Sequence, residues 1–213
     1  MSGPVDARVN PGAINRYTDL YPAGILERSV ITTVPKPYAG HGRRVYPGFL
    51  QLARFMGLDP ARHASAFARF FLDIAAGREP SERTRPFYEE FFAVLDIAAE
   101  FYLDTARMIF RDHDLARGEL RWRGRRVDPS VIRSALLSVE GENDELCPPG
   151  QTRAAHALCT GIPAGRKRHH LQKSVGHYGV FNGSNFRREI YPQIRGFIAE
   201  MSSADYDEHG REP

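Results

Sequence analysis

The sequence predicts an α/β fold, and two stretches of different character support this prediction. Residues 134–181 contain two strand-like runs separated by a predicted helix, and each run is followed by a polar turn or loop. Residues from about 13 to 115 instead carry apolar and aromatic side chains spaced three and four apart, which is typical of amphipathic helices. A small sheet with helices, together with a mainly helical region, accounts for both patterns.

The composition is that of a globular protein with one domain. The 213 residues allow one core, with room for a cap, and 42% apolar and 26% charged residues are ordinary values. The net charge of +3 is too small to require a polyanionic partner. The two cysteines do not indicate a disulfide framework, and no apolar run approaches the roughly 20 residues of a transmembrane helix. Residues 1–6 lack the features of a secretory signal, so we expect a cytoplasmic protein.

The first half of the chain is expected to be helical. Asn10 followed by Pro11 predicts the start of a short helix, and residues 25–31 predict a second one. Longer helices are predicted over 46–57, 59–77, 81–95 and from Asp96 onward. Their aromatic side chains either form the core of a helical cap or line a hydrophobic channel for an acyl chain. The sequence leaves both interpretations open.

The second half contains the predicted strands. Residues 118–127 indicate a β-hairpin with a turn at Arg123 and Gly124. Beyond it we expect a strand over 135–139, a helix over 151–160, a strand over 168–171 and a surface helix over 185–201 packed on the sheet.

Two residues that follow these strands have the pattern of a catalytic pair. Asp144 follows the first strand, and His177 follows the second strand between two glycines. Side chains in these positions can meet above the edge of the sheet, where a carboxylate orients an imidazole that acts as general base. An α/β-hydrolase presents its catalytic acid and histidine in this order, after its nucleophile. The alternative is that Asp144 lies in an ordinary loop and that His177, flanked by glycines, only caps a helix.

Other polar residues are weaker candidates. Asp6 is a rival acid only if a strand precedes it, and a turn is the simpler interpretation. His156 is expected to be packed or exposed rather than catalytic. His169 and His170 are neighbours in a strand and should point to opposite faces, so a metal site is not expected. The acidic residues interpreted as solvated loop charges are Glu140, Glu142 and Glu145.

Two basic clusters, 121–126 and 166–170, raise the alternative of nucleic-acid binding. Trp122 lies in the first cluster, and an aromatic ring among arginines can stack on bases while the charges bind phosphates. The chain is rich in arginine throughout, and its 29 basic residues nearly balance its 26 acidic ones. We therefore do not expect a nucleic-acid partner.

The pattern of a catalytic triad lacks its nucleophile. No Gly-x-Ser-x-Gly elbow is present, and none of the serines has a comparable setting. Cys147 and Cys159 both lie downstream of the position where a nucleophile belongs. Neither cysteine is therefore assigned that role.

Eight motifs spread over nearly the whole chain carry a family resemblance. They are Gly3-Pro-Val-Asp-Ala-Arg-Val-Asn-Pro11, Arg44-Val-Tyr-Pro-Gly-Phe49, Phe92-Ala-Val-Leu-Asp96, Glu100-Phe-Tyr-Leu103, Gly118-Glu-Leu-Arg-Trp-Arg-Gly-Arg-Arg-Val-Asp-Pro129, Val139-Glu-Gly-Glu-Asn-Asp144, Gly176-His-Tyr-Gly-Val-Phe181 and Glu189-Ile-Tyr-Pro192. With these motifs the sequence resembles the carboxyl-terminal part of the intracellular polyhydroxybutyrate (polyhydroxyalkanoate) depolymerases, a family of bacterial α/β-hydrolases.

The resemblance implies cleavage of ester bonds in the polymer of storage granules, by hydrolysis or by thiolysis with coenzyme A. It implies no resident cofactor, and it places the catalytic acid at Asp144 and the base at His177. Residues from about 13 to 115 would form the helical cap, and about 116–201 would form the last strands and helices of the hydrolase core. The implied partner is the polyhydroxyalkanoate polymer or the granule surface.

The sequence departs from the family in one large respect. Family members carry an amino-terminal half with most of the sheet, the oxyanion loop and the nucleophile, and no such half is present here. We therefore expect the chain alone to be inactive, since losing the nucleophile of a triad costs on the order of 10⁶ in rate. A strand facing the missing sheet would have unpaired backbone groups, so we expect a marginal or aggregating fold, or a partner chain that carries the other half. The alternative is a non-catalytic remnant that binds the polymer or the granule.

Overall fold

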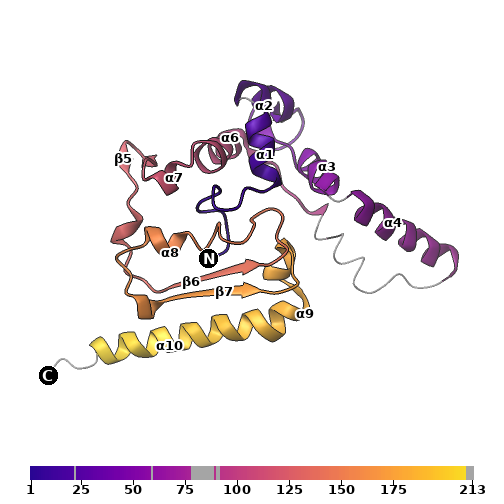
Figure 1. Ribbon diagram of the computed structural model, residues 1–213. Helices are drawn as coiled ribbons and strands as arrows, with labels where there is room; N and C mark the ends of the chain where they lie inside the picture. The colour runs from indigo at the N-terminus through magenta and orange to yellow at the C-terminus, as the bar shows by residue number, and fades with distance from the viewer. Residues whose placement is uncertain (22, 59, 78–88, 90–91, 210–213) are drawn as a thin grey trace. The chain divides into compact units, whose positions relative to one another are not determined.

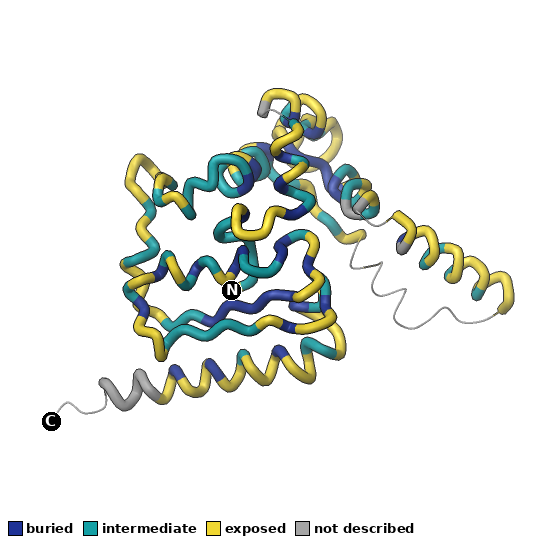
Figure 2. Tube along the Cα trace, in the orientation of Figure 1, coloured by how far each residue is buried: buried dark blue, intermediate teal, exposed yellow. Residues whose placement is uncertain are grey.

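The computed structural model describes residues 1–21, 23–58, 60–77, 89 and 92–209, and the chain divides into two compact units. The first unit joins residues 1–20 to residues 105–213, and the second unit comprises residues 21–104. Figure 1 gives the labels of the elements, and Figure 2 shows how far each residue is buried. The expected α/β class is confirmed by the mixture of helices and small sheets. A cap role for the predicted helical region stays a prediction.

The centre of the first unit is a pair of parallel strands, β6 (Leu136–Gly141) and β7 (Lys167–Gln172). The two strands lie side by side and point the same way (Figure 1), in a register that pairs Ser138 with His169. Both strands were predicted, and each is slightly longer than the sequence pattern indicates. The link between them contains a short helix, α8 (Ala155–Leu158), and a 3-10 turn, η3 (Ala164–Arg166).

Helix α10 (Tyr191–His209) runs along the sheet and buries one of its faces (Figure 1). It is preceded by a short helix, α9 (Gly183–Asn185), and a π-helix, η5 (Phe186–Ile190). Because side chains alternate between the two faces of a strand, β6 directs every second residue toward α10. The resulting core consists of Leu137, Val139, Val175, Val180, Ile190, Phe197 and Met201. The predicted surface helix packed on a sheet is confirmed.

The amino-terminal segment lies along the outer edge of β6. The ammonium group of Met1 donates to the carbonyl of Leu137 at 2.7 Å, and the amide of Val139 donates to the carbonyl of Met1 at 2.9 Å. This is the hydrogen-bond pattern of one parallel bridge, so Met1 satisfies part of the edge that the sequence predicted to be unpaired. Further along, the hydroxyl of Thr152 donates to the carbonyl of Gly3 at 2.8 Å.

The remaining elements of the first unit are short. They are α1 (Ala13–Leu20), the π-helix η1 (Ala106–Arg111), α7 (Asp114–Arg117), the hairpin strands β4 (Arg121–Trp122) and β5 (Arg125–Arg126), and the 3-10 turns η2 (Pro129–Val131) and η4 (His177–Val180). The hairpin is confirmed. Helix α1 begins later than predicted because Asn10 bonds to the carbonyl of Pro149, while Asn15 accepts from the amide of Gly12.

The second unit combines helices with a small antiparallel sheet. Its elements are α2 (Ala23–Val30), β1 (Thr32–Thr33), β2 (Arg44–Tyr46), α3 (Gly48–Leu58), α4 (Pro60–Ala75), β3 (Ile97–Ala98) and α6 (Ala99–Thr105), with strand order β1-β2-β3. The sequence predicted α2, α3, α4 and α6 but none of the strands. Asp96, expected to cap a helix, instead accepts a hydrogen bond from the amide of Gly48 at 2.8 Å. The helix predicted over 81–95 falls largely outside the described residues.

Candidate functional site

The structure brings the predicted acid and histidine into contact. Nδ1 of His177 lies 2.9 Å from Oδ2 of Asp144. Asp144 stands in the turn that follows β6, and His177 is the first residue of η4, which follows β7. Because the two strands are parallel neighbours, their carboxyl ends lie at the same edge of the sheet and present both side chains there.

The Asp144 carboxylate is fixed by its own turn. Its Oδ1 accepts hydrogen bonds from the backbone amides of Leu146 at 2.9 Å and Cys147 at 2.8 Å. Its side chain is only 1% exposed. With Oδ1 used by the backbone, Oδ2 is the atom left to accept from the imidazole, so the turn aims the carboxylate at His177.

The His177 ring is positioned with one nitrogen inward and a third of its side chain exposed. A carboxylate only accepts hydrogen bonds, so Nδ1 carries the proton and Nε2 is the basic nitrogen. The rings of Tyr178 and Phe181 lie edge-on to the imidazole, with centroids 5.9 and 5.7 Å away. These edge contacts limit how the imidazole ring can turn.

Glycines allow the two loops to approach each other closely. A Cβ at Gly141 would lie 2.8 Å from the carbonyl oxygen of Val175, and that oxygen accepts a hydrogen bond from the amide of Asn143. A Cβ at Gly179 would lie 2.6 Å from Cβ of Val175. A side chain at Gly141 would push the two loops apart, and with them Asp144 from His177, whereas a side chain at Gly179 would distort the loop that carries His177.

A second cluster of polar side chains lies on the face of β6 and β7 opposite α10. The Ser138 hydroxyl is 2.7 Å from Nε2 of His156 and 2.9 Å from Nδ1 of His169. Nε2 of His169 in turn lies 3.6 Å from a carboxylate oxygen of Glu140. We call these four residues the buried polar cluster. His156 is therefore packed, as expected, while His169 and His170 point to opposite faces, since His170 bonds to Gln172.

The interpretation of Glu140 as a solvated loop charge is wrong. Glu140 is 2% exposed, and its carboxylate accepts the backbone amides of Gly150, Thr152 and Arg153 at 2.7 to 2.8 Å. The strand extends two residues further than predicted, which places Glu140 on the same inward face as Ser138. The predicted helix over 151–160 is reduced to α8, and the amides of Thr152 and Arg153, at the start of the predicted range, bond to the Glu140 side chain. Glu142 and Glu145 are exposed, as expected.

The buried polar cluster has the residue types of a hydrolytic triad but cannot act as one. Ser138 is fully buried, and its hydroxyl is shared between two histidines. The Glu140 carboxylate already accepts three backbone amides. Burial lowers the pKa of both His156 and His169, with smaller contributions from neighbouring charges. The cluster is therefore a structural feature that holds the β6–β7 link, and the sequence pattern did not reveal it.

Comparison with known proteins identifies a family for the chain. A family model described as "PHB de-polymerase C-terminus" matches residues 2–202. The chain belongs to this family. The match spans both units and includes Asp144 and His177.

Two curated relatives carry a different name. Each is a "Poly(3-hydroxyalkanoate) polymerase subunit PhaC", one from Haloferax mediterranei and one from Haloarcula marismortui. Both are 26% identical to the chain, over 114 and 109 residues respectively. The matched region covers 54% and 51% of this chain but only 22% of each relative, so the chain corresponds to a small part of these proteins. The family is thus shown, while cleavage and synthesis of the polymer are both represented in the names.

Neither cysteine of this family member has the setting of a nucleophile. Both are buried, and burial raises the pKa of the Cys147 thiol to about 11, with a weaker opposing effect from its hydrogen bond to Thr152. A thiol with that pKa is almost wholly protonated at neutral pH, and the thiolate is the reactive form. Asp6, the rival acid, forms an ion pair with Arg8 at 2.8 Å, and this bond lowers the pKa of its carboxyl group.

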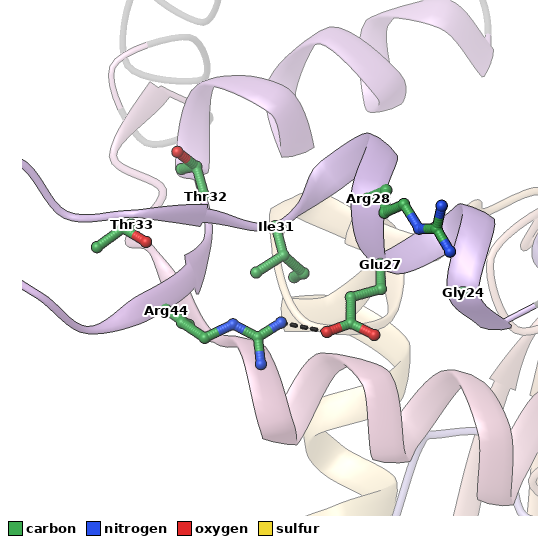
Figure 3. A pocket seen from close by; sticks show the side chains of 7 residues that line it. All are labelled: Gly24, Glu27, Arg28, Ile31, Thr32, Thr33 and Arg44. Carbon is green, nitrogen blue, oxygen red and sulfur yellow. Dashed lines mark hydrogen bonds and ion pairs between the residues drawn. The ribbon is translucent and has the colours of Figure 1, made fainter.

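A shallow pocket of about 390 Å³ lies in the second unit (Figure 3). Its lining includes an ion pair between Arg44 and Glu27, drawn as a dashed line, and the side chain of Arg28. It contains neither residue of the Asp144–His177 pair.

Among the described residues no group of three or more histidine, cysteine or acidic side chains could hold a metal ion. None of the helices in the described part of the chain is long and apolar enough to cross a bilayer.

Proposed function

We propose that this chain supplies the acid and the histidine of a site that cleaves ester bonds in polyhydroxyalkanoate. The observation that supports the proposal most is the contact between His177 and the buried, backbone-held carboxylate of Asp144. The family match supports the substrate class. Under this proposal the protein acts in the cytoplasm at the surface of polymer granules.

The roles follow from the geometry of the pair. Asp144 holds the Nδ1–H of His177 and balances the positive charge that forms on the ring. Nε2 takes the proton of the attacking nucleophile and returns it to the alcohol that leaves when the ester bond breaks. Water then completes hydrolysis, or coenzyme A completes thiolysis, with Nε2 again accepting the proton of the attacking group.

The nucleophile must come from a segment other than the described residues. Cys147 is buried with a raised pKa, and Ser138 is enclosed in the buried polar cluster. We propose an upstream half, in the same polypeptide or in a partner chain, that contributes the nucleophile and the oxyanion donors. Asp144 and His177 then act only in its presence.

The names of the two relatives favour a second candidate, formation of the polymer. The same pair serves this reaction, because a histidine that activates a nucleophile for ester cleavage also activates it toward a 3-hydroxyacyl thioester. A third candidate, binding of the polymer or granule without catalysis, needs neither Asp144 nor His177.

The test measures release of 3-hydroxybutyrate units from native amorphous granules. Three samples are compared: the chain alone, the chain with the upstream half supplied, and that mixture with His177→Ala. The same samples are assayed for polymer formation from 3-hydroxybutyryl-coenzyme A. His156→Gln is the matched control, because it replaces a histidine of the same unit outside the proposed site.

Release of monomer by the complemented mixture, abolished by His177→Ala and retained with His156→Gln, is the expected result. Polymer formation with the same dependence on His177, without release, would replace cleavage by synthesis. Activity of the chain alone that survives His177→Ala would overturn the assignment of the pair. Granule binding without either activity would favour the non-catalytic candidate.

A further inference from the structure

The segment around the β4–β5 hairpin carries an excess of positive charge. Residues 117–128 contain Arg117, Arg121, Arg123, Arg125 and Arg126 against Glu119 and Asp128, which gives a net charge of +3. The whole chain also has a net charge of +3. The remaining residues are therefore neutral in sum, since the basic residues of 166–173 are balanced by acidic residues elsewhere in the chain.

The hairpin presents its arginines on both faces. Strands β4 and β5 pair with Arg121 opposite Arg126 and Trp122 opposite Arg125. Because neighbouring residues of a strand point to opposite sides, one face carries two arginines and the other carries Trp122 and an arginine. All four strand residues are exposed, and Trp122 is 69% exposed. Two like charges directly opposite each other destabilise a hairpin unless an anion compensates them.

These arginines have no acidic partners within contact distance in the described part of the chain, unlike those of the second basic cluster. Arg121 donates to the backbone carbonyl of Gly124, and no ion pair is formed by Arg123, Arg125 or Arg126. In the cluster over 166–170, by contrast, Arg168 is held by Glu200, and Lys167 donates to the carbonyl of His156. The second cluster thus has an acidic partner for Arg168, whereas among the described residues the hairpin arginines form no ion pair. The pKa of the Asp128 carboxyl group is lowered first by its hydrogen bond to Ser130, and of the hairpin arginines only Arg126 is close enough to add to that effect.

The turn of the hairpin places a further arginine, Arg123, in a strained backbone conformation at its tip. Arg123 and Gly124 have positive φ angles of 48° and 76°, as in a type I′ turn. Asparagine and glycine suit the first of these positions much better than arginine does. The guanidinium of Arg123 lies 5.7 Å from the ring centroid of Trp122, so charge and aromatic ring are presented together.

We propose that the β4–β5 hairpin binds an anionic lipid surface, with arginines among the phosphate headgroups and Trp122 at their depth. A headgroup layer surrounds an inserted ribbon and meets charges on both of its faces. A single nucleic-acid strand follows one face and would leave the arginines of the other face unpaired. Tryptophan also prefers the boundary between headgroups and acyl chains, because its ring is apolar and its N–H is polar.

The full chain reports on this binding directly, because Trp122 is its only tryptophan. The experiment mixes the chain with vesicles of phosphatidylcholine alone or with an equal part of phosphatidylglycerol, and follows tryptophan emission and co-sedimentation. We expect a blue shift and pelleting with the anionic vesicles only, reversed by high salt because charges are screened. Arg121→Gln/Arg126→Gln should weaken binding roughly 25-fold, at roughly fivefold per arginine near the surface.

Two further variants separate binding from folding. Arg123→Asn should relieve the strained turn, leaving the melting temperature equal or higher while binding weakens roughly fivefold. Arg187→Gln/Arg195→Gln is the matched control, since it removes two exposed arginines elsewhere in the same unit. Equal weakening by this control would overturn the hairpin as the site. Absence of a blue shift at low salt, or tighter binding to oligothymidylate than to the anionic vesicles, would overturn the lipid surface as the ligand.

Discussion

At the scale of single residues, the positions of Asp144 and Glu140 differ in how far the sequence could predict them. Asp144 follows a strand, and its contact with His177 agrees with the position that the sequence pattern indicated. Glu140 lies in the same acid-rich stretch as Glu142 and Glu145, and nothing in the spacing distinguishes it from them. Glu140 is buried because β6 extends as far as this residue and because backbone amides of the segment between β6 and β7 need an acceptor. Both conditions are set by tertiary packing.

Glu140→Ala should destabilise the protein more than substitution of any neighbouring glutamate. The change leaves three backbone amides without their acceptor, and a buried unsatisfied donor costs about 1–3 kcal/mol. We expect the free energy of unfolding to fall by at least about 3 kcal/mol, measured by urea denaturation. Glu145→Ala, at an exposed position, should change it by less than about 0.5 kcal/mol. Equal effects of the two variants would contradict the role given to Glu140.

The buried polar cluster should make stability depend on pH. Burial lowers the pKa of His156 and His169 below the usual value of 6.5, so the unfolded chain binds protons before the folded one does. The stability from this source is present above about pH 6.5 and is lost as the pH falls through the lowered values. The charges around the two rings are Glu140, which opposes the shift, and Arg153, Lys167 and His170, which add to it.

The measurement is the urea midpoint between pH 7.5 and 5, for the parent chain and for His156→Gln, whose side chain can still bond to Ser138. The parent midpoint should fall toward acid pH, and the variant should show a shallower fall because one titrating group is gone. A parallel fall in both proteins would assign the dependence to other groups.

At the scale of secondary-structure elements, the length of a strand or helix decided whether the sequence could predict it. The hairpin, β6, β7 and α10 have enough residues, or a distinct enough turn, to show their period in the sequence. Strands β1, β2 and β3 have two or three residues each, too few for an alternating pattern. Their pairing is set by contacts between distant segments, such as Tyr46 opposite Ile97, which no local pattern encodes.

Two isoleucines, one in the π-helix η5 and one in α10, allow the packing against the sheet to be tested with a matched control. Ile190, at its end, is fully buried in the core with Val139 and Phe197, whereas Ile198 on α10 is 58% exposed. Ile190→Ala should therefore lower the free energy of unfolding by about 2–5 kcal/mol, the usual cost of a buried cavity. Ile198→Ala should leave it within about 0.5 kcal/mol. Comparable losses, measured by thermal or urea denaturation, would mean that α10 does not bury its apolar side as described.

At the scale of the whole molecule, each unit buries part of its apolar side chains and exposes others. The first unit closes a core between its sheet and α10, and both units also expose large apolar residues. In α4, Phe71 and Leu72 are 65% and 64% exposed, and the ring of Phe71 meets the ring of its neighbour Phe70 edge-on, with the centroids 6.0 Å apart. The sequence alone left open whether such aromatics form a core or a channel, because both uses share the same helical spacing.

Exposed apolar side chains of this size should make the isolated chain associate with itself. Water-exposed hydrophobic surface is stabilised by burial at about 25 cal/mol per Å², so copies that cover α4 gain free energy. Sedimentation velocity over a range of concentrations should show growing assemblies for the parent chain and a larger monomer fraction for Phe71→Gln/Leu72→Gln. Ala64→Gln/Ala68→Gln, at exposed positions of the same helix, is the control and should behave as the parent does. A parent chain that stays monomeric at all concentrations and melts in one sharp transition would show that α4 needs no cover and that the fold is stable alone.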